Sequence, residues 1–78
     1  MFFTGHALLR MDERDIAEEE VYEVFNRKYV SLTGKVQKII GKTDEGRFLV
    51  LFVADHTRLV SLREADDKEV KLYKRRVK

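Results

Sequence analysis

The chain has 78 residues and a net charge of +2, which fits one domain spanning residues 1–78. It contains no Cys, so neither a disulfide framework nor a thiolate metal site can support its small core. No segment is apolar and long enough to cross a membrane, and the N-terminus lacks the basic and apolar regions of a signal peptide. We therefore expect a soluble, cytoplasmic protein without a metal ion or a cofactor.

Charged residues make up 38% of the chain, and Pro is absent. Many charges with few amide side chains are typical of thermophile proteins, although chance in a short chain explains the composition equally well. The charges are unevenly placed: acids dominate residues 12–23, and bases dominate residues 68–78. This asymmetry permits a nucleic-acid-binding face, but a solvated helix surface explains most such runs.

The first helix is predicted at residues 6–14, opened by Thr4 or Gly5 after a lead-in that is either a short edge strand or an ordered segment. Three basic side chains recur every four residues and share one side of this helix: His6, Arg10 and Arg14. The other side carries apolar residues suited to packing on a sheet: Ala7, Leu8 and Met11.

A second helix is predicted to begin at Asp15, with Glu18 completing an Asp variant of the capping box. Its apolar stripe has helical spacing and should pack on the sheet: Ala17, Val21, Val24 and Phe25. The helix should end near residues 26–28.

The period then changes to two, which predicts a strand over residues 29–40 that bends or bulges at Gly34. A hairpin turn at residues 43–46 leads into Phe48–Val53, six consecutive apolar residues that we expect at the centre of the sheet. A tight turn at Asp55–His56 should lead into a third strand over residues 57–63.

The last helix is predicted to begin at Asp66, with Glu69 three residues later and an apolar stripe of Val70, Tyr73 and Val77. Strands joined by short turns must be antiparallel. The predicted fold is therefore α+β: two N-terminal helices, a three- to four-stranded antiparallel meander and a C-terminal helix.

Two segments carry a resemblance to known families. Residues 6–16 match the pattern H-A-x-x-R-M-x-E-R-x-I and are followed by an acidic helix ending in V-x-x-V, as in a family of small, uncharacterised prokaryotic domains. Residues 58–63 and 69–73 resemble the closing strand R-x-I-S-x-R and helix E-x-x-x-Y of BrnT-type toxins from bacterial toxin–antitoxin pairs. Together the two matches cover most of the chain.

The resemblance implies a RelE- or barnase-like ribonuclease fold. It also implies metal-independent RNA cleavage, with RNA as substrate and a small antitoxin protein as partner. Such cleavage needs a base for the 2′-hydroxyl, an acid for the leaving oxygen and cations for the phosphorane.

The candidate catalytic residues are His6, Arg10 and Arg63. An unperturbed imidazole titrates near pH 6.5, so His6 suits proton transfer, although a capping or packing role fits it equally well. Arg63 is expected to bind phosphate through its planar fork. We expect His6 and Arg63 on one side of the sheet, with Arg10 beside His6.

Further candidate RNA-binding residues are Arg14, Arg58, Lys35, Arg47 and Tyr73. Arg14 fits surface pairing with a nearby Glu better, and Arg58 is expected on the face opposite Arg63 because of strand alternation. Tyr73 is favoured as a core residue over a base-stacking one. No motif supports Lys35 or Arg47, and His56 is expected to be a turn residue.

Three functions compete. The leading one is a small ribonuclease toxin, and the alternative is a non-catalytic RNA- or protein-binding module of the same fold. The third is an interaction protein that forms a homodimer through exposed edges. Convergence of His6 and Arg63 in one cleft would distinguish the first from the second, and a large exposed apolar patch would favour the third.

Overall fold

A computed structural model describes residues 1–77 of the chain. Three helices and five strands follow one another in this order: β1 (Phe2–Phe3), α1 (Gly5–Arg14), α2 (Glu18–Phe25), β2 (Val30–Leu32), β3 (Gln37–Lys42), β4 (Phe48–Ala54), β5 (Arg58–Glu64) and α3 (Asp67–Arg76). The α+β prediction with two N-terminal helices and a C-terminal helix is confirmed. The sheet has five strands, whereas three or four were expected.

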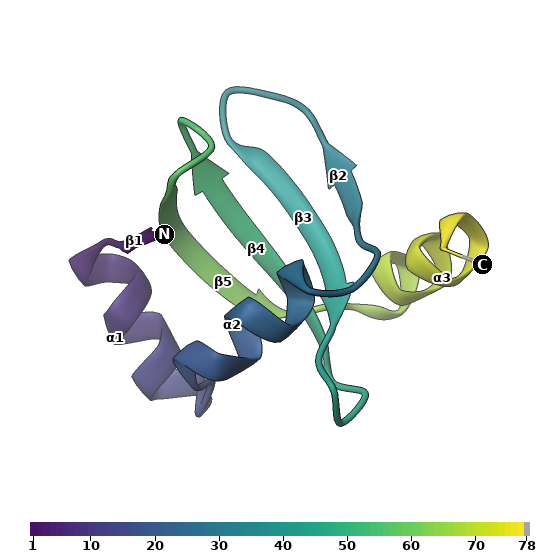
Figure 1. The fold of residues 1–78 in the computed structure, drawn as a ribbon, viewed down its shortest axis with the longest axis horizontal. Coiled ribbons are helices and arrows are strands. Elements are labelled where there is room, and N and C mark those ends of the chain that lie inside the picture. Colours follow the sequence, from purple (N-terminus) through teal and green to yellow (C-terminus); the bar gives the residue numbers. More distant parts are fainter. Residues whose placement is uncertain (78) are drawn as a thin grey trace.

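The five strands form one sheet in the order β1-β5-β4-β3-β2 (Figure 1). Strands β2 to β5 are antiparallel neighbours, whereas the two-residue strand β1 pairs with β5 in parallel. Strand β4 is central, as its unbroken apolar run predicts, because a strand in this position is covered on both faces.

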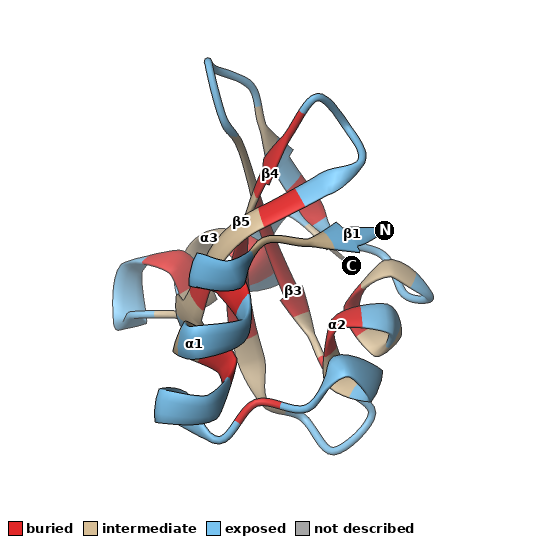
Figure 2. Cartoon of the chain, turned by 90° about the vertical axis from the view of Figure 1, so that its left-hand side faces the viewer, coloured by how far each residue is buried: buried red, intermediate tan, exposed pale blue. Residues whose placement is uncertain are grey.

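Helices α1 and α2 cover one face of the sheet, which we call the α1/α2 face (Figure 1). Their inward side chains pack on alternate residues of the strands, and Figure 2 shows the buried parts of both helices turned toward the sheet. The fully covered cluster on this face comprises Ala7, Met11, Ile16, Val21, Val24, Ile39, Leu49, Leu51, Val53, Leu59 and Leu62.

Helix α3 covers only part of the opposite face, which we call the α3 face. Tyr73 packs there on Val30, Ile40 and Val50, with Phe48 and Leu72 at the margin. The Tyr73 ring meets the Phe48 ring edge-on at 5.4 Å. Beyond this cluster, toward the Asp55–Thr57 turn, the strand residues of the α3 face are partly exposed.

The two helix starts show how local signals act. At α3 the prediction is confirmed: the Asp66 carboxylate accepts from the Glu69 N–H at 2.8 Å, and Glu69 accepts from the Asp66 N–H at 2.9 Å. At α2 it is wrong: Ala17 is the N-cap residue, and the Glu20 carboxylate accepts from its N–H at 3.0 Å.

Asp15, which was expected to begin α2, instead ends α1 in the left-handed conformation with φ 54°. Asp tolerates this conformation better than most residues with a Cβ. The following residue, Ile16, turns into the core and takes the place expected of Ala17, which is exposed.

The single strand expected over residues 29–40 is two strands. Residues 33–36 form a turn, so β2 folds back on β3 with Val30 opposite Ile40. The period-two pattern continued through the turn, and Gly34 marked a reversal of the chain rather than a bend within one strand. The other two turns are confirmed, with Gly46 at φ 89° and both Asp55 and His56 at positive φ.

A β-bulge in β5 changes which of its side chains share a face. Ser61 lies opposite Phe52, but Leu59 lies opposite Val53, so Val60 is the extra residue. Leu59 and Leu62 consequently both face the α1/α2 cluster, three positions apart.

Candidate nucleic-acid interface

The partly exposed part of the α3 face carries aromatic and cationic side chains on neighbouring strands. We call it the open face, and it consists of Phe2 from β1, Lys38 from β3, Phe52 from β4, and Arg58, Ser61 and Arg63 from β5. These residues lie close together because β1, β5, β4 and β3 are adjacent in the sheet.

Two aromatic side chains belong to the open face. Phe3 lies opposite Leu59 and packs on the α1/α2 cluster, so the preceding Phe2 points to the other side of the sheet, where it is 65% exposed. Phe52 lies beneath the Arg63 guanidinium, whose carbon is 5.7 Å from the ring centre. An aromatic face beside a cation suits a flat, negatively charged ligand.

Arg63 and Lys38 are joined by one carboxylate. Glu69 of α3 accepts from both Arg63 Nη atoms, at 2.7 and 2.9 Å, and forms an ion pair with Lys38. The hydrogen bond from Arg63 is the main reason that the pKa of Glu69 falls to about 2, against an ordinary value of 4.5. Glu69 is therefore ionised at neutral pH, and the three residues together carry one positive charge.

The bulge at Val60 adds Arg58 to this surface. Sequence alternation placed Arg58 on the face opposite Arg63, and this expectation is wrong. Arg58 lies opposite Ala54, and its neighbour Leu59 points into the α1/α2 cluster, so Arg58 and Arg63 share the α3 face. The Arg58 side chain is 47% exposed and pairs with Asp55 at 3.2 Å.

His6 and Arg10 do not converge with Arg63, so the expected catalytic arrangement is not formed. Both lie on α1, whose Ala7 and Met11 pack on the α1/α2 face, while Arg63 lies on the α3 face. His6 is exposed in the first turn of α1, and Arg10 pairs with Glu13 at 3.1 Å. The sheet separates the two halves of the expected site.

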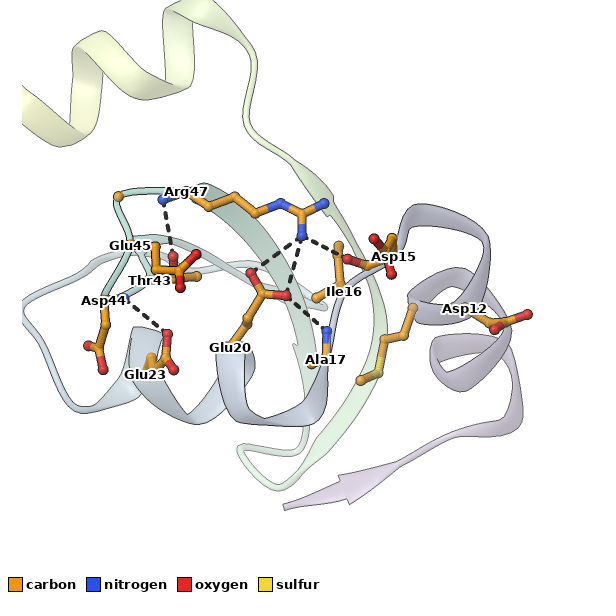
Figure 3. Close-up of a pocket in the computed structure, with 12 residues that line it drawn as sticks. Asp12, Asp15, Ile16, Ala17, Glu20, Glu23, Thr43, Asp44, Glu45 and Arg47 are labelled. Atoms are coloured by element: carbon orange, nitrogen blue, oxygen red, sulfur yellow. Dashed lines mark hydrogen bonds and ion pairs between the residues drawn. The ribbon is translucent and has the colours of Figure 1, made fainter.

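Arg47 holds the corner between α1 and α2 instead of facing a nucleic acid (Figure 3). Its guanidinium donates to the carbonyls of Arg14 and Asp15, at 2.9 and 2.8 Å, and to the Glu20 carboxylate at 3.3 Å. These contacts satisfy two carbonyls at the C-terminal end of α1, which the helix itself leaves without donors. The side chain of Arg14 is exposed on the same α1/α2 side.

The remaining expected residues are dispersed. Tyr73 is buried, and its hydroxyl donates to the Lys28 carbonyl at 3.3 Å, which supports its core assignment. Lys35 is exposed in the β2–β3 turn, at the end of the sheet that also holds the turn containing His56.

Sequence reasoning missed three members of this region: Phe2, Lys38 and Glu69. Lys38 and Ile40 are two residues apart, so their side chains point to the same face of the strand. A charged residue on an otherwise apolar face was the sequence signal that could have identified Lys38. Glu69 was recognised as a capping residue, and its pairing with Arg63 needed the path of α3. For Phe2 the signal was absent, since a two-residue strand has no periodicity.

Residues 1–77 contain neither a cluster of metal ligands nor a membrane-spanning helix. In this described part, no group of three or more His, Asp or Glu side chains is arranged to hold a metal ion. No helix there combines the length and the apolar character needed to cross a membrane.

Comparison with known proteins identifies one family. Residues 3–73 match the family described as "Domain of unknown function (DUF4258)". No curated protein and no solved structure matches the chain significantly. Because the match spans most of the sequence, the chain belongs to the DUF4258 family.

Proposed function

We propose that this domain binds single-stranded RNA on its open face. One observation carries the proposal: two aromatic side chains, Phe2 and Phe52, alternate with three cations on a partly exposed sheet surface. Single-stranded nucleic acids are bound where bases stack on aromatic rings and phosphates meet Lys or Arg. A duplex offers no unstacked bases to such a surface.

The resemblance to BrnT-type toxins supports the same face. Three residues of its closing strand motif lie there: Ser61 and Arg63 by strand alternation, and Arg58 because of the bulge. The residues of its helix motif fix α3 to the sheet: Glu69 binds Arg63, and Tyr73 packs on Phe48.

A metal-independent ribonuclease, restrained by a small antitoxin, is the second candidate. It is favoured by Arg63 and Lys38, which lie within reach of one carboxylate and can together stabilise a pentacoordinate phosphate. His6 is excluded from this version of the site because it belongs to the opposite face. Cleavage would then depend on positioning and charge at the open face.

Binding is tested by fluorescence anisotropy with a labelled twelve-nucleotide single-stranded RNA. The three cations offer at most three phosphate contacts, so the salt exponent should reach at most about −2, and affinity should fall by up to roughly twentyfold between 50 and 200 mM salt. Phe52→Ala removes a stacking surface and should weaken binding roughly tenfold. The matched control is Tyr22→Ala, which removes an exposed aromatic side chain from α2 on the other side of the sheet.

Two results would contradict binding at the open face: no binding at 50 mM salt, or equal losses from Phe52→Ala and Tyr22→Ala. Cleavage is assayed separately on the same RNA in the presence of a chelator. The second candidate predicts cleavage that Lys38→Ala slows and His6→Ala leaves unchanged, and Arg63 still pairs with Glu69 in the Lys38 variant. Binding without cleavage identifies the non-catalytic module.

A further inference from the structure

Helix α3 crosses the strands of the sheet and does not run along them. It begins just after the end of β5, and within its first turn Glu69 binds Arg63 of β5 and Lys38 of β3. One turn later the Tyr73 hydroxyl donates to the carbonyl of Lys28, shortly before β2. The C-terminal end of α3 therefore lies on the β2 side of the sheet, as Figure 1 shows.

One side of α3 forms a wall beside the open face. Glu69 marks this side, because its carboxylate binds two residues of the open face, Arg63 and Lys38. Leu72 and Arg76 follow Glu69 by three and seven residues, so they lie on the same side of the helix. Leu72 is partly buried against the cluster beneath α3, whereas Arg76 is exposed.

Arg76 has no acidic partner in the described part of the chain, since no salt bridge within residues 1–77 engages it. The helix dipole favours a base in the last turn, and Lys74 and Arg75 share that turn. The dipole acts equally on all sides of the helix. Lys74 lies on the other side, with its Nζ 5.8 Å from the centre of the Phe48 ring. Arg76 is therefore the base of this turn that shares a side with Glu69.

The open face extends across the strands toward the same end of the sheet. Ser61, Phe52 and Lys38 lie side by side on β5, β4 and β3. Leu32 of β2 lies opposite Lys38 and continues this row. Neighbouring strands are about 4.8 Å apart, so the distance from β1 to β2 is about 19 Å. Single-strand-binding domains cover about four nucleotides or more, and a surface of this length suits such a segment.

We propose that the RNA crosses the strands from β1 to β2 and that Arg76 binds a phosphate at the β2 end of this path. The inference rests on the RNA binding proposed above and adds the class of ligand: a single-stranded segment of several nucleotides, not a mononucleotide. Bases stack on the aromatic rings of the open face while the cations follow the backbone. The planar guanidinium of Arg76 suits a phosphate because it can donate two parallel hydrogen bonds.

The first test is fluorescence anisotropy with the labelled twelve-nucleotide RNA. A fourth phosphate contact raises the limit of the salt exponent from about −2 to about −3. Arg76→Ala should weaken binding roughly fivefold at 50 mM salt and reduce the exponent by about 0.7. The matched control is Lys74→Ala, which removes the same charge from the same turn but from the side next to Phe48. It should change affinity less than twofold.

The second test is an NMR titration of the ¹⁵N-labelled wild type with the same RNA. Shift changes should extend from β1 across β5, β4 and β3 to the backbone amides of Leu32, Leu72 and Arg76. The amides of α1 and α2 cover the other face of the sheet and should not shift.

Three results would contradict the proposal. Equal losses from Arg76→Ala and Lys74→Ala would show that the charge of α3 acts from a distance, without a contact at Arg76. Shift changes confined to β1, β5 and β4 would show a shorter path. Both results overturn the path and leave RNA binding at the open face intact. Absence of binding at 50 mM salt would overturn both proposals.

Discussion

The two faces of the sheet differ in how completely they are covered. On the α1/α2 face, two helices bury Leu49, Leu51, Leu59 and Val24 completely, and the backbone comes so close that a Cβ on Gly41 would lie 2.4 Å from Val24. On the α3 face, one helix covers part of the strands and leaves Phe52 and Arg58 partly exposed. The first face holds the larger buried cluster, and the second combines a smaller buried cluster under α3 with strand residues that stay partly exposed.

The largest expected effect separates two neighbours on β4, Leu51 and Phe52. Leu51→Asp places an unpaired charge in a fully buried position and should unfold a domain of this size. Phe52→Asp changes a partly exposed position on the open face, so the domain should stay folded at 25 °C while RNA affinity falls. Circular dichroism with thermal unfolding measures the first effect, and anisotropy measures the second.

A folded Leu51→Asp variant would show that the α1/α2 face is not the main core. Val50→Asp provides the control for the covered part of the α3 face. Val50 is also fully buried, beneath Tyr73, and its variant should unfold as well. An Asp substitution should therefore unfold the domain at covered positions on either face, and it should be tolerated only on the open part of the α3 face.

The next effect concerns the carboxylate that attaches α3 to the open face. The pKa of Glu69 is depressed to about 2 in the folded protein by its hydrogen bonds to Arg63 and Lys38. A depressed pKa contributes stability that is fully present above the ordinary value of 4.5 and is lost as pH falls from there toward 2. The Glu69 side chain is 8% exposed, but its partner Arg63 is 33% exposed, so solvent screens the pair in part and the contribution is at most on the order of 3 kcal/mol.

Glu69→Gln should therefore lower the free energy of unfolding by up to about 3 kcal/mol at pH 7, and the difference from wild type should largely disappear near pH 2. Gln keeps an oxygen for the Asp66 N–H, so the helix cap is preserved. Urea unfolding at pH 7, 4 and 2.5 measures the difference. A constant difference across this range would show that the loss comes from packing rather than from ionisation.

The fold was predictable where one local signal determined the structure. The apolar run at β4 predicted its central position, and the Asp66–Glu69 pair predicted the start of α3. Predictions failed where two local solutions compete: both Asp15 and Ala17 can precede a helix, and the alternation of residues 29–40 does not show where the chain reverses. Packing of Ile16 into the core decided the first case.

The site was less predictable because it depends on which side of the sheet each element occupies. Helical spacing correctly placed His6 and Arg10 on one side of α1, but it carries no information on which sheet face α1 covers. Strand alternation assigned Arg58 to the wrong face, because one bulge residue, Val60, reverses the parity of everything before it. In both cases the face of the sheet was assigned wrongly, and the spacing of residues along the sequence does not reveal which face is correct.

The smallest expected effect is that of a substitution on α1, which tests whether the α1/α2 side takes part in RNA binding. Arg10→Ala removes an exposed i,i+3 ion pair with Glu13, which should cost about 0.2–0.5 kcal/mol of unfolding free energy. RNA affinity should change less than twofold, because Arg10 lies on the α1/α2 side, away from the open face. Arg58→Ala is the matched comparison: it also removes one exposed Arg paired to an acid three residues away, and it should reduce both affinity and the salt exponent. If Arg10→Ala weakened RNA binding as much as Arg58→Ala, RNA would have to contact both sides of the sheet, and the assignment of separate roles to the two faces would be wrong.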